Sequence, residues 1–312
     1  MPDQKLNKIR TVFAGTPSFA IPSVEAIARQ NEFELVGVYT QPDKPTGRGK
    51  KIMGSAVKRA LSAFDVPIFQ PKSLSDDDEL KTFRTLKPEL FVVAAYGLII
   101  PGDFLEIPRY CINVHASLLP RWRGAAPIHR AIMNGDLRTG ISIMRIVEKL
   151  DAGPILNIKV REIEPTDTTA TLTKKLAQDG ADALKECLLN ITQGTVTEKP
   201  QKDENALYAE KISKTESLIT WSVPAEVISL KIRALSHQPG ATAYLGKILV
   251  KIISAKISKE TSTGRPGTLN LTSKNTLTVA TTTKNLQIDL LQLPGKKIIT
   301  AKDFLNGYRK LL

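Results

Sequence analysis

The chain has 312 residues, 42% of them hydrophobic, which is enough to form two domains. Its net charge of +13 favours a polyanionic partner, although a lysine-rich surface can also serve only to keep a protein soluble. No run approaches the roughly 20 apolar residues of a membrane span, and the N-terminus is too polar for a signal peptide, so we expect no membrane association and a bacterial-type cytosolic location. The two cysteines, Cys111 and Cys187, lack metal-ligand spacing, which excludes a disulfide framework and a structural zinc site.

The chain begins with the pattern of a strand, a turn and a helix. Residues 9–14 are an apolar run typical of a buried strand, and residues 21–28 place apolar side chains at helical spacing. A second strand is expected at 35–40. The first turn offers Gly15 without the further glycines of a dinucleotide fingerprint, and the second strand ends without the acid that would hold a ribose. We therefore expect no NAD.

Residues 42–55 (PDKPTGRGKKIMGS) are rich in proline, glycine and basic side chains. At this density, prolines and glycines indicate a loop, so we expect no regular element here. Arg48 lies between two glycines, which gives the backbone freedom to approach a partner closely. A basic loop of this kind suits a phosphate backbone, although a solvated loop has the same composition. Its basic residues are Lys44, Arg48, Lys50 and Lys51.

Helices and strands alternate up to residue 97. We expect helices at 57–64 and 76–86 and a short strand at 68–70. The run 89–97 (ELFVVAAYG) is almost continuously apolar, as in a central parallel strand, and it ends at Tyr96 and Gly97. This alternation predicts an α/β fold with a Rossmann-like, doubly wound and mostly parallel sheet.

The segment 112–127 (INVHASLLPRWRGAAP) carries the polar groups around which we expect the chain to be arranged. Asn113 and His115 are two residues apart in a strand, so their side chains point to the same face of the sheet. Ser117, Pro120 and Gly124 follow, so the pair lies where a strand gives way to a loop. In open α/β sheets, this edge is where ligands bind.

Two helices and two strands are expected to complete the first domain. The helix at 126–134 contains His129, which we interpret as a packing or surface residue. Strands at 139–146 and 155–163 alternate in hydrophobicity, and the turn between them displays Asp151 ahead of Gly153 and Pro154. A long amphipathic helix at 168–191 closes this domain.

The character of the sequence changes after residue 193. Residues 194–207 are polar and lack periodicity, so we expect a linker between domains at 1–193 and 208–312. A helix at 225–235 precedes short β-branched runs, which indicate a small OB-like β-barrel. Residues 201–312 hold 17 Lys and Arg against eight Asp and Glu, so the barrel carries most of the net charge and is a second candidate RNA surface. The expected strands lie at 247–256, 268–271, 277–280 and 285–293.

Asn113, His115 and Asp151 are suited to acyl or formyl transfer to an amine. An amide and an imidazolium donate to an oxyanion, and a carboxylate sets the charge of the imidazole and accepts a proton through water. This chemistry needs no metal and no covalent step. Cys111 and His115 are four residues apart in a strand, roughly 13 Å, which is too far to share a proton.

The segment 112–127, together with DAGPIL at 151–156, resembles the formyltransferase family that uses 10-formyltetrahydrofolate. Other segments narrow the resemblance to the members that formylate methionyl initiator tRNA. They are FAGTPSFA (13–20), QPDKPTGRGKK (41–51), VAAYGLIIP (93–101), YAEKISK (208–214), and LQLPGKK with DFLNG near the C-terminus. One segment departs from the family pattern: residues 232–240 read IRALSHQPG, where relatives have a segment rich in aromatic residues and proline. The departure concerns the packing or RNA contact of the start of the barrel and not the reaction.

The resemblance implies the reaction and its catalytic residues. It implies that the α-amino group of methionine on the tRNA attacks the formyl carbon of 10-formyltetrahydrofolate and releases tetrahydrofolate through a tetrahedral intermediate. The family's catalytic asparagine, histidine and aspartate fall on Asn113, His115 and Asp151. Asn113 and His115 are expected to stabilise the oxyanion, while Asp151 keeps His115 charged. No metal is expected, and the enzyme is expected to be a monomer.

The resemblance also places the binding residues. The family's folate-contacting signature falls on Ser117, Leu118, Leu119 and Pro120. We assign the neighbouring strand end to the same folate site, at Tyr96 and Gly97. The loop that senses initiator tRNA falls on residues 42–51, with its important arginine at Arg48 and with Lys44, Lys50 and Lys51 beside it.

Three alternatives have different partners. A formyltransferase for a small amine, glycinamide ribonucleotide or an amino-sugar nucleotide, would share the catalytic residues but would not need a basic loop and a basic barrel. A non-enzymatic RNA-binding protein would keep the charge without needing Asn113 and His115 together. A nucleotide-dependent reductase fits the sheet but not the broken glycine pattern.

Overall fold

The computed structural model describes residues 8–46, 49, 51–236, 238–271 and 275–312. They divide into two compact units. The first comprises the described residues up to Gly124 together with Thr139–Glu162 and Thr173–Tyr208. The second comprises Ala125–Arg138, Ile163–Leu172 and Ala209–Leu312. Each unit is described in turn.

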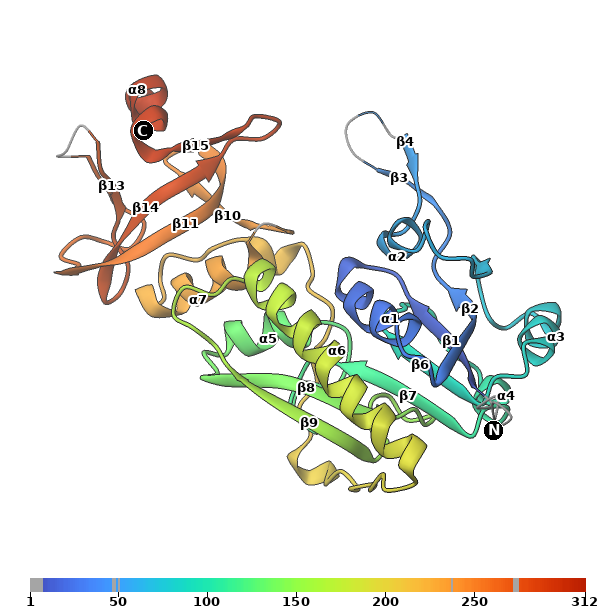
Figure 1. Ribbon diagram of the computed structural model, residues 1–312. Helices are drawn as coiled ribbons and strands as arrows, with labels where there is room; N and C mark the ends of the chain where they lie inside the picture. Colours follow the sequence, from blue (N-terminus) through green and yellow to red (C-terminus); the bar gives the residue numbers. More distant parts are fainter. Residues whose placement is uncertain (1–7, 47–48, 50, 237, 272–274) are drawn as a thin grey trace, which may run out of the picture. The chain divides into compact units, whose positions relative to one another are not determined.

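A seven-stranded sheet forms the centre of the first unit, in the order β5-β2-β1-β6-β7-β8-β9 (Figure 1). The five strands from β5 to β7 are parallel, and β8 runs antiparallel to β7. Strand β6 is buried along its whole length, as its continuous apolar run predicts. The mostly parallel α/β sheet predicted from the sequence is confirmed. The strands are β1 (Ile9–Gly15), β2 (Phe33–Tyr39), β5 (Ile68–Phe69), β6 (Leu90–Ala94), β7 (Tyr110–His115), β8 (Arg138–Arg145) and β9 (Ile155–Glu162).

Side-chain hydrogen bonds cap the starts of helices α2 and α3 of the first unit. The Ser55 hydroxyl accepts from the Lys58 N–H and caps α2, and the Asp76 carboxylate caps α3 by accepting from the Asp78 N–H. Helix α2 ends earlier than the predicted helix at 57–64. The helices are α1 (Ile21–Ala28), α2 (Ala56–Ala60), α3 (Asp77–Thr85), α4 (Gly102–Leu105) and α6 (Thr169–Gln193), with 3-10 turns η1 (Ser18–Ala20) and η2 (Asp203–Asn205).

Helix α6 packs along one face of β7, β8 and β9 (Figure 1). A side chain on Gly180 would approach Val114 of β7 to 3.0 Å, so this glycine allows the helix to lie close to the sheet. Ion pairs attach the edge strand to the helix: Lys159 of β9 binds Asp182 at 2.7 Å, and Arg161 binds the buried Asp179. The opposite face of β7 and β8 is thereby left to the loops that carry the polar residues.

A short hairpin occupies part of the segment predicted to lack regular structure. Strands β3 (Lys44–Thr46) and β4 (Lys51–Met53) pair antiparallel, so the expectation of an irregular loop throughout 42–55 was wrong. Backbone pairing tolerates Pro45 because a two-stranded ribbon leaves an unpaired edge on each strand, where the missing N–H is not needed. Arg48 and Lys50, between the two strands, lie outside the described residues.

The segment 194–207, predicted as a linker, is hydrogen-bonded to the first unit. Lys199 exchanges both backbone hydrogen bonds with Ile155 at the start of β9. Further along, the Leu207 N–H donates to the Pro120 carbonyl, and the Arg123 N–H donates to the Leu207 carbonyl at 2.8 Å. The segment therefore follows the loop between β7 and α5, where the predicted site lies.

An antiparallel half-barrel forms the centre of the second unit, with the strand order β10-β11-β14-β13-β12 and β15 beside β14. The register between β11 and β14 shifts three times, and such irregularities bend and twist a long strand. The predicted antiparallel β-sheet after the α/β domain is confirmed, although β10 and the full length of β11 were not predicted. The strands are β10 (Ala241–Leu245), β11 (Ile248–Thr261), β12 (Leu269–Asn270), β13 (Leu277–Val279), β14 (Lys284–Gln292) and β15 (Ile298–Thr300).

Helices cover the core of the second unit. Helix α7 contributes Ile228, Ile232 and Leu235 to a cluster that α8 completes with Phe304. Helix α7 has the bounds that its periodicity predicts, whereas α8 was not predicted. The helices are α5 (Pro127–Met133), α7 (Ala225–Leu235) and α8 (Ala301–Tyr308), with the 3-10 turns η3 (Thr215–Ser217) and η4 (Arg309–Leu311).

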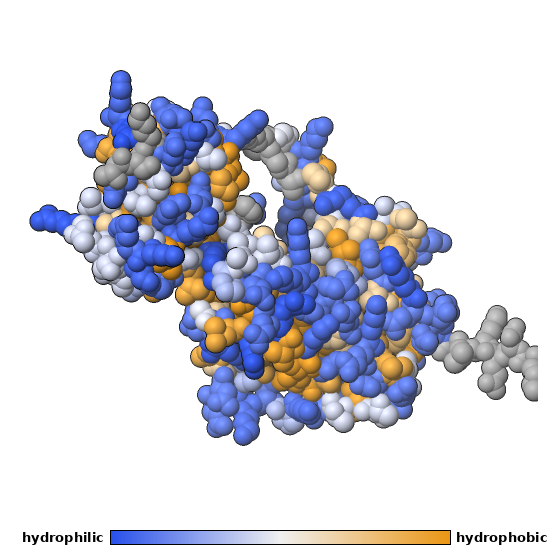
Figure 2. All heavy atoms as spheres, turned by 60° about the vertical axis from the view of Figure 1, so that its left-hand side comes forward, coloured by the Kyte–Doolittle hydropathy of each residue, from blue (hydrophilic) through white to orange (hydrophobic). Residues whose placement is uncertain are grey.

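Hydrophilic residues cover most of the face shown in Figure 2, with hydrophobic residues exposed in smaller areas between them. Among the described helices, none is long and apolar enough to cross a bilayer. Within the same residues, no group of three or more His, Cys, Asp or Glu is arranged to hold a metal ion.

Candidate active site

Two neighbouring parallel strands end at the predicted site. Strand β7 carries Asn113 and His115 at its C-terminal end, and Asn113 lies opposite Val93 of β6. His115 is buried, while Asn113 is half-buried. In the part of the chain that the structure describes, the Asn113 amide has no hydrogen-bond partner, so it can bind a ligand.

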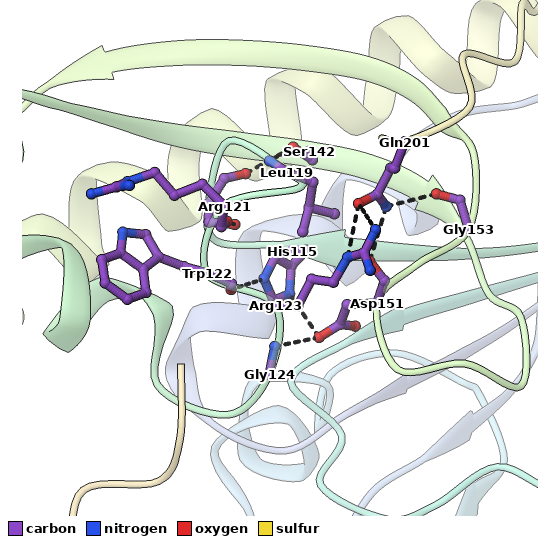
Figure 3. A network of polar contacts seen from close by, with 11 residues as sticks. His115, Leu119, Arg121, Trp122, Arg123, Gly124, Ser142, Asp151, Gly153 and Gln201 are labelled. Carbon is purple, nitrogen blue, oxygen red and sulfur yellow. Dashed lines mark hydrogen bonds and ion pairs between the residues drawn. The ribbon is translucent and has the colours of Figure 1, made fainter. Parts of the chain in front are cut away.

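The structure places Asp151 beside His115. The His115 Nδ1 atom lies 3.6 Å from the Asp151 Oδ2 atom (Figure 3). The same carboxylate oxygen accepts a hydrogen bond of 2.8 Å from the Gly124 N–H, which fixes it from the other side. Asp151 follows β8 in the turn that leads to β9, and its φ of +47° is a conformation that residues other than glycine rarely adopt.

The Trp122 carbonyl orients the ring of His115. The His115 Nε2 atom lies 2.9 Å from the Trp122 carbonyl, and because a carbonyl only accepts, Nε2 carries a hydrogen. Nδ1 faces the Asp151 carboxylate. The two ring nitrogens therefore have different partners, a backbone carbonyl at Nε2 and a carboxylate at Nδ1.

The predicted folate signature forms a loop that is closed by its own hydrogen bonds. The buried Ser117 hydroxyl donates to the Arg121 carbonyl at 2.5 Å. Ser142 of β8 donates to the Ser117 carbonyl at 2.8 Å and accepts from the Leu119 N–H, so the loop is tied to the sheet. The Ser117 hydroxyl is thus engaged within the loop. Of the four signature residues, Ser117 and Leu119 are buried, and Leu118 and Pro120 are half-buried, so only the last two expose surface to a ligand.

The turn after β6 is held by hydrogen bonds to its carbonyl groups. The Thr16 hydroxyl and the Gln41 amide both donate to the Tyr96 carbonyl, and Gln41 also donates to the Gly97 carbonyl at 3.1 Å. Burial raises the pKa of the Tyr96 hydroxyl. Gly97 is exposed and has a φ of +83°, which suits glycine. The turn therefore presents backbone at the same edge as Asn113.

A polar cluster supports the base of the β3–β4 hairpin. Lys44 donates to Gln41 at 2.6 Å, which connects the hairpin to the turn after β6. Hydrogen bonds from Gln70 and then Lys58 hold the pKa of the Asp43 carboxyl below its ordinary value. Of the predicted basic residues, Lys44 and Lys51 lie on the described strands, and the remaining two lie outside the described residues.

Buried thiols do not supply a nucleophile at this edge. Burial raises the pKa of Cys111 and that of Cys187 to about 12, so both remain protonated at neutral pH. Neither forms a disulfide. The thiolate form of cysteine is therefore not available at this edge.

Arg123 and Gln201 also belong to the network, and the sequence did not predict them. The fully buried Arg123 guanidinium donates to the Gln201 side-chain oxygen, and the Gln201 amide donates to the Asp151 and Gly153 carbonyls (Figure 3). Arg123 was visible in the signature segment, but its sequence context resembles that of an exposed loop arginine. Gln201 lies in the segment predicted as a linker, where no pattern pointed to it.

Comparisons with known proteins add a second line of observation. Residues 7–188 match the formyl transferase family, and residues 211–309 match the formyl transferase C-terminal domain. The methionyl-tRNA formyltransferase of Pseudomonas putida (strain GB-1) is 44% identical over 97% of this chain and 97% of that protein. The methionyl-tRNA formyltransferase of Methylococcus capsulatus is 44% identical over 96% of this chain and 97% of that protein. The structure of the N-formyltransferase from Helicobacter canadensis with folinic acid and dTDP-3-aminofucose has a TM-score of 0.69 and 19% identity, covering 90% of this chain and 99% of that one, which shows a shared fold.

Proposed function

The chain belongs to the formyl transferase family, and from this premise we propose that it transfers the formyl group of 10-formyltetrahydrofolate to the α-amino group of methionyl initiator tRNA. The observation that carries the acceptor is the identity to methionyl-tRNA formyltransferases along almost the whole chain, including the second unit. The observation that supports the chemistry is the His115–Asp151 pair at the strand edge that also carries Asn113.

The proposed reaction is a direct attack by the amine. The neutral amino nitrogen forms a bond to the formyl carbon, and the formyl oxygen becomes an oxyanion. The Asn113 amide and the His115 imidazolium are the donors that stabilise this charge, and one such donor contributes about 10² to 10³ in rate. To reach the oxyanion through Nε2, His115 exchanges its hydrogen bond to the Trp122 carbonyl for one to the substrate.

The tetrahedral intermediate collapses after protons have moved. The attacking nitrogen loses a proton, the N10 nitrogen of the folate gains one, and the bond between N10 and the formyl carbon breaks. Asp151 accepts the proton from the attacking nitrogen through water and keeps His115 cationic. The products are N-formylmethionyl-tRNA and tetrahydrofolate, so atoms and charges balance without a covalent enzyme intermediate.

The proposed folate site joins the turn after β6 to the loop after β7. In this proposal, backbone groups of Tyr96 and Gly97 and the half-buried Leu118 and Pro120 contact the folate, while Ser117 and Leu119 shape the loop from within. We propose Lys44, Arg48, Lys50 and Lys51 as the tRNA contacts of the hairpin, because their charges suit the phosphate backbone.

A formylation assay tests the proposal. Labelled 10-formyltetrahydrofolate is incubated with the purified protein and, in parallel, with methionyl initiator tRNA, methionyl elongator tRNA, glycinamide ribonucleotide or an amino-sugar nucleotide. We expect label on the initiator tRNA alone. Labelling of a small amine in preference to tRNA would instead support the small-substrate formyltransferase, and labelling of no acceptor would contradict formyl transfer.

A further inference from the structure

A buried cation lies behind the proposed catalytic carboxylate. The side chain of Arg123 is fully buried. Its two neighbours in the chain contact the proposed catalytic pair: the Trp122 carbonyl contacts His115, and the Gly124 N–H donates to Asp151. The guanidinium donates to the Gln201 oxygen at 3.1 and 2.9 Å and to the Asp203 carboxylate at 2.9 Å. A buried charge with this set of partners holds the partners in place, because leaving any of them unpaired is costly.

Gln201 uses its whole amide group in this network. Its oxygen accepts both bonds from Arg123, and its nitrogen donates to the Asp151 carbonyl at 2.9 Å and to the Gly153 carbonyl at 2.7 Å (Figure 3). The chemistry of the partners fixes the orientation of the amide, since the guanidinium only donates and the carbonyls only accept. A glutamate at this position could pair with Arg123 but could not donate to the two carbonyls.

The backbone that Gln201 holds is the one that aims the carboxylate. The positive φ of Asp151 is a strained conformation, which persists only where the surroundings hold it. The two hydrogen bonds from Gln201 bind the turn at Asp151 itself and two residues later. The Asp151 carboxylate itself accepts from the N–H of Gly124, the residue after Arg123, and the same oxygen faces His115.

We propose that Gln201 and Arg123 are positioning residues that set the Asp151 carboxylate against His115. The proposal rests on the proposed function for its effect on rate. Gln201 binds the Asp151 backbone, and Arg123 orients Gln201. The segment 194–207 is therefore part of the active site, since it supplies Gln201, on which the position of the Asp151 carboxylate depends.

Kinetics of Gln201→Ala, Gln201→Glu and Arg123→Lys test the proposal in the full-length protein. We expect kcat to fall about 10- to 100-fold for each, in the range seen when a supporting hydrogen-bond partner is lost, with KM for the folate changed less than about threefold. Gln30→Ala is the matched control and should keep its kcat, because the Gln30 side-chain amide, just after α1, donates to the Ala26 carbonyl far from this network.

A double-mutant cycle separates positioning from a general structural defect. If Gln201 acts through Asp151, then Gln201→Ala should lower kcat by less than about twofold in an Asp151→Asn background. An equal loss in both backgrounds would overturn the proposal, as would a kcat within twofold of the parent for both Gln201→Ala and Gln201→Glu.

Hydrogen exchange tests the geometry without reference to the reaction. We expect faster deuterium uptake in a peptide spanning residues 148–156 for Gln201→Ala and Gln201→Glu than for the parent, and no change for Gln30→Ala. Unchanged uptake would overturn the positioning role even in an active enzyme. Faster uptake in a protein that formylates no acceptor would contradict the proposed function and leave the role of Gln201 in place.

Discussion

At the residue scale, the first prediction concerns the proposed oxyanion donors, Asn113 and His115, and the proposed proton acceptor, Asp151. We expect Asn113→Ala, His115→Ala and Asp151→Asn each to lower kcat by about 10² to 10⁴, because each removes a donor or a proton acceptor from the transition state. Steady-state formylation of methionyl initiator tRNA measures the effect. The control is His129→Gln, whose half-buried imidazole lies on α5 in the second unit. Parental rates for His115→Ala or Asp151→Asn would show that the roles are wrongly assigned.

A second residue-scale prediction concerns acid stability. Hydrogen bonds from Arg130 and the Ser213 backbone lower the pKa of Glu216 from its ordinary 4.5 to about 2. A lowered pKa in the folded state stabilises the protein above the unfolded-state value, and this contribution is lost as pH falls from about 4.5 towards 2. Glu216→Gln should therefore be less stable than the parent at pH 7, and the difference should shrink below pH 4.5.

Urea unfolding at several pH values measures this difference. Arg130→Met provides the matched test from the other side of the pair, because it removes the main cause of the lowered pKa and should remove the same pH dependence. A difference between the parent and Glu216→Gln that stays constant from pH 7 to pH 2.5 would contradict the prediction.

The sequence could indicate some of these residues and not others. Alternation along a strand is enough to place Asn113 and His115 on one face, and the turn residues around Asp151 predict that it is displayed. Arg123 and Gln201 are 78 residues apart in the chain, and their contact depends on the path of a segment without periodicity. The Trp122 carbonyl and the Gly124 N–H are backbone groups, which leave no trace in residue type.

At the element scale, the turn between β8 and β9 depends on a close backbone approach. A Cβ on Gly153 would lie 2.0 Å from the Arg145 carbonyl oxygen, so Gly153→Ala forces the turn away from β8. We expect a loss of about 1–3 kcal/mol in the free energy of unfolding, as for other overpacked sites, together with a lower kcat because Asp151 moves with the turn.

Chemical denaturation and the formylation assay check the two parts of that prediction. Gly102→Ala at the start of α4 is the matched control, since its Cβ would meet only a flexible Glu148 oxygen at 3.6 Å. The control should keep the parental stability. An equally stable Gly153→Ala variant would show that the turn adapts without strain.

The elements themselves were predictable where one physical signal dominated. Continuous apolar runs mark β1 and β6, and helical spacing gives the bounds of α7. The β3–β4 hairpin was missed because Pro45 and the nearby glycines lower strand propensity, while backbone pairing alone was enough to form it. The end of β11 was missed because Lys259, Glu260 and Thr261 are exposed, so that pairing with β14, not burial, keeps this part of the strand extended.

At the scale of the whole molecule, the family resemblance and the two-part fold are confirmed, and the charge distribution gives a further test. The net charge of +13 is unevenly distributed, because residues 201–312 have a net charge of +9 and residues 1–200 a net charge of +4. If these lysines and arginines contact tRNA phosphates, each contact releases counterions, and the affinity falls steeply as salt rises.

The test measures tRNA binding between about 50 and 200 mM salt, where six to ten phosphate contacts cost about 10³ to 10⁵ in affinity. Lys44→Ala and Lys51→Ala should each lower the slope of log affinity against log salt by about one. An affinity that does not depend on salt would favour the small-amine acceptor.

The two buried cysteines can serve as probes of local opening in the central sheet of this enzyme. Cys111 lies on β7, two residues before Asn113, and Cys187 lies on the helix that packs against that strand. Alkylating reagents react with thiolates that solvent can reach, and neither sulfur meets that condition in the folded state. The rate at which iodoacetamide modifies the two thiols therefore reports how often the sheet opens locally. If a bound folate stabilises this edge of the sheet, it should lower that rate.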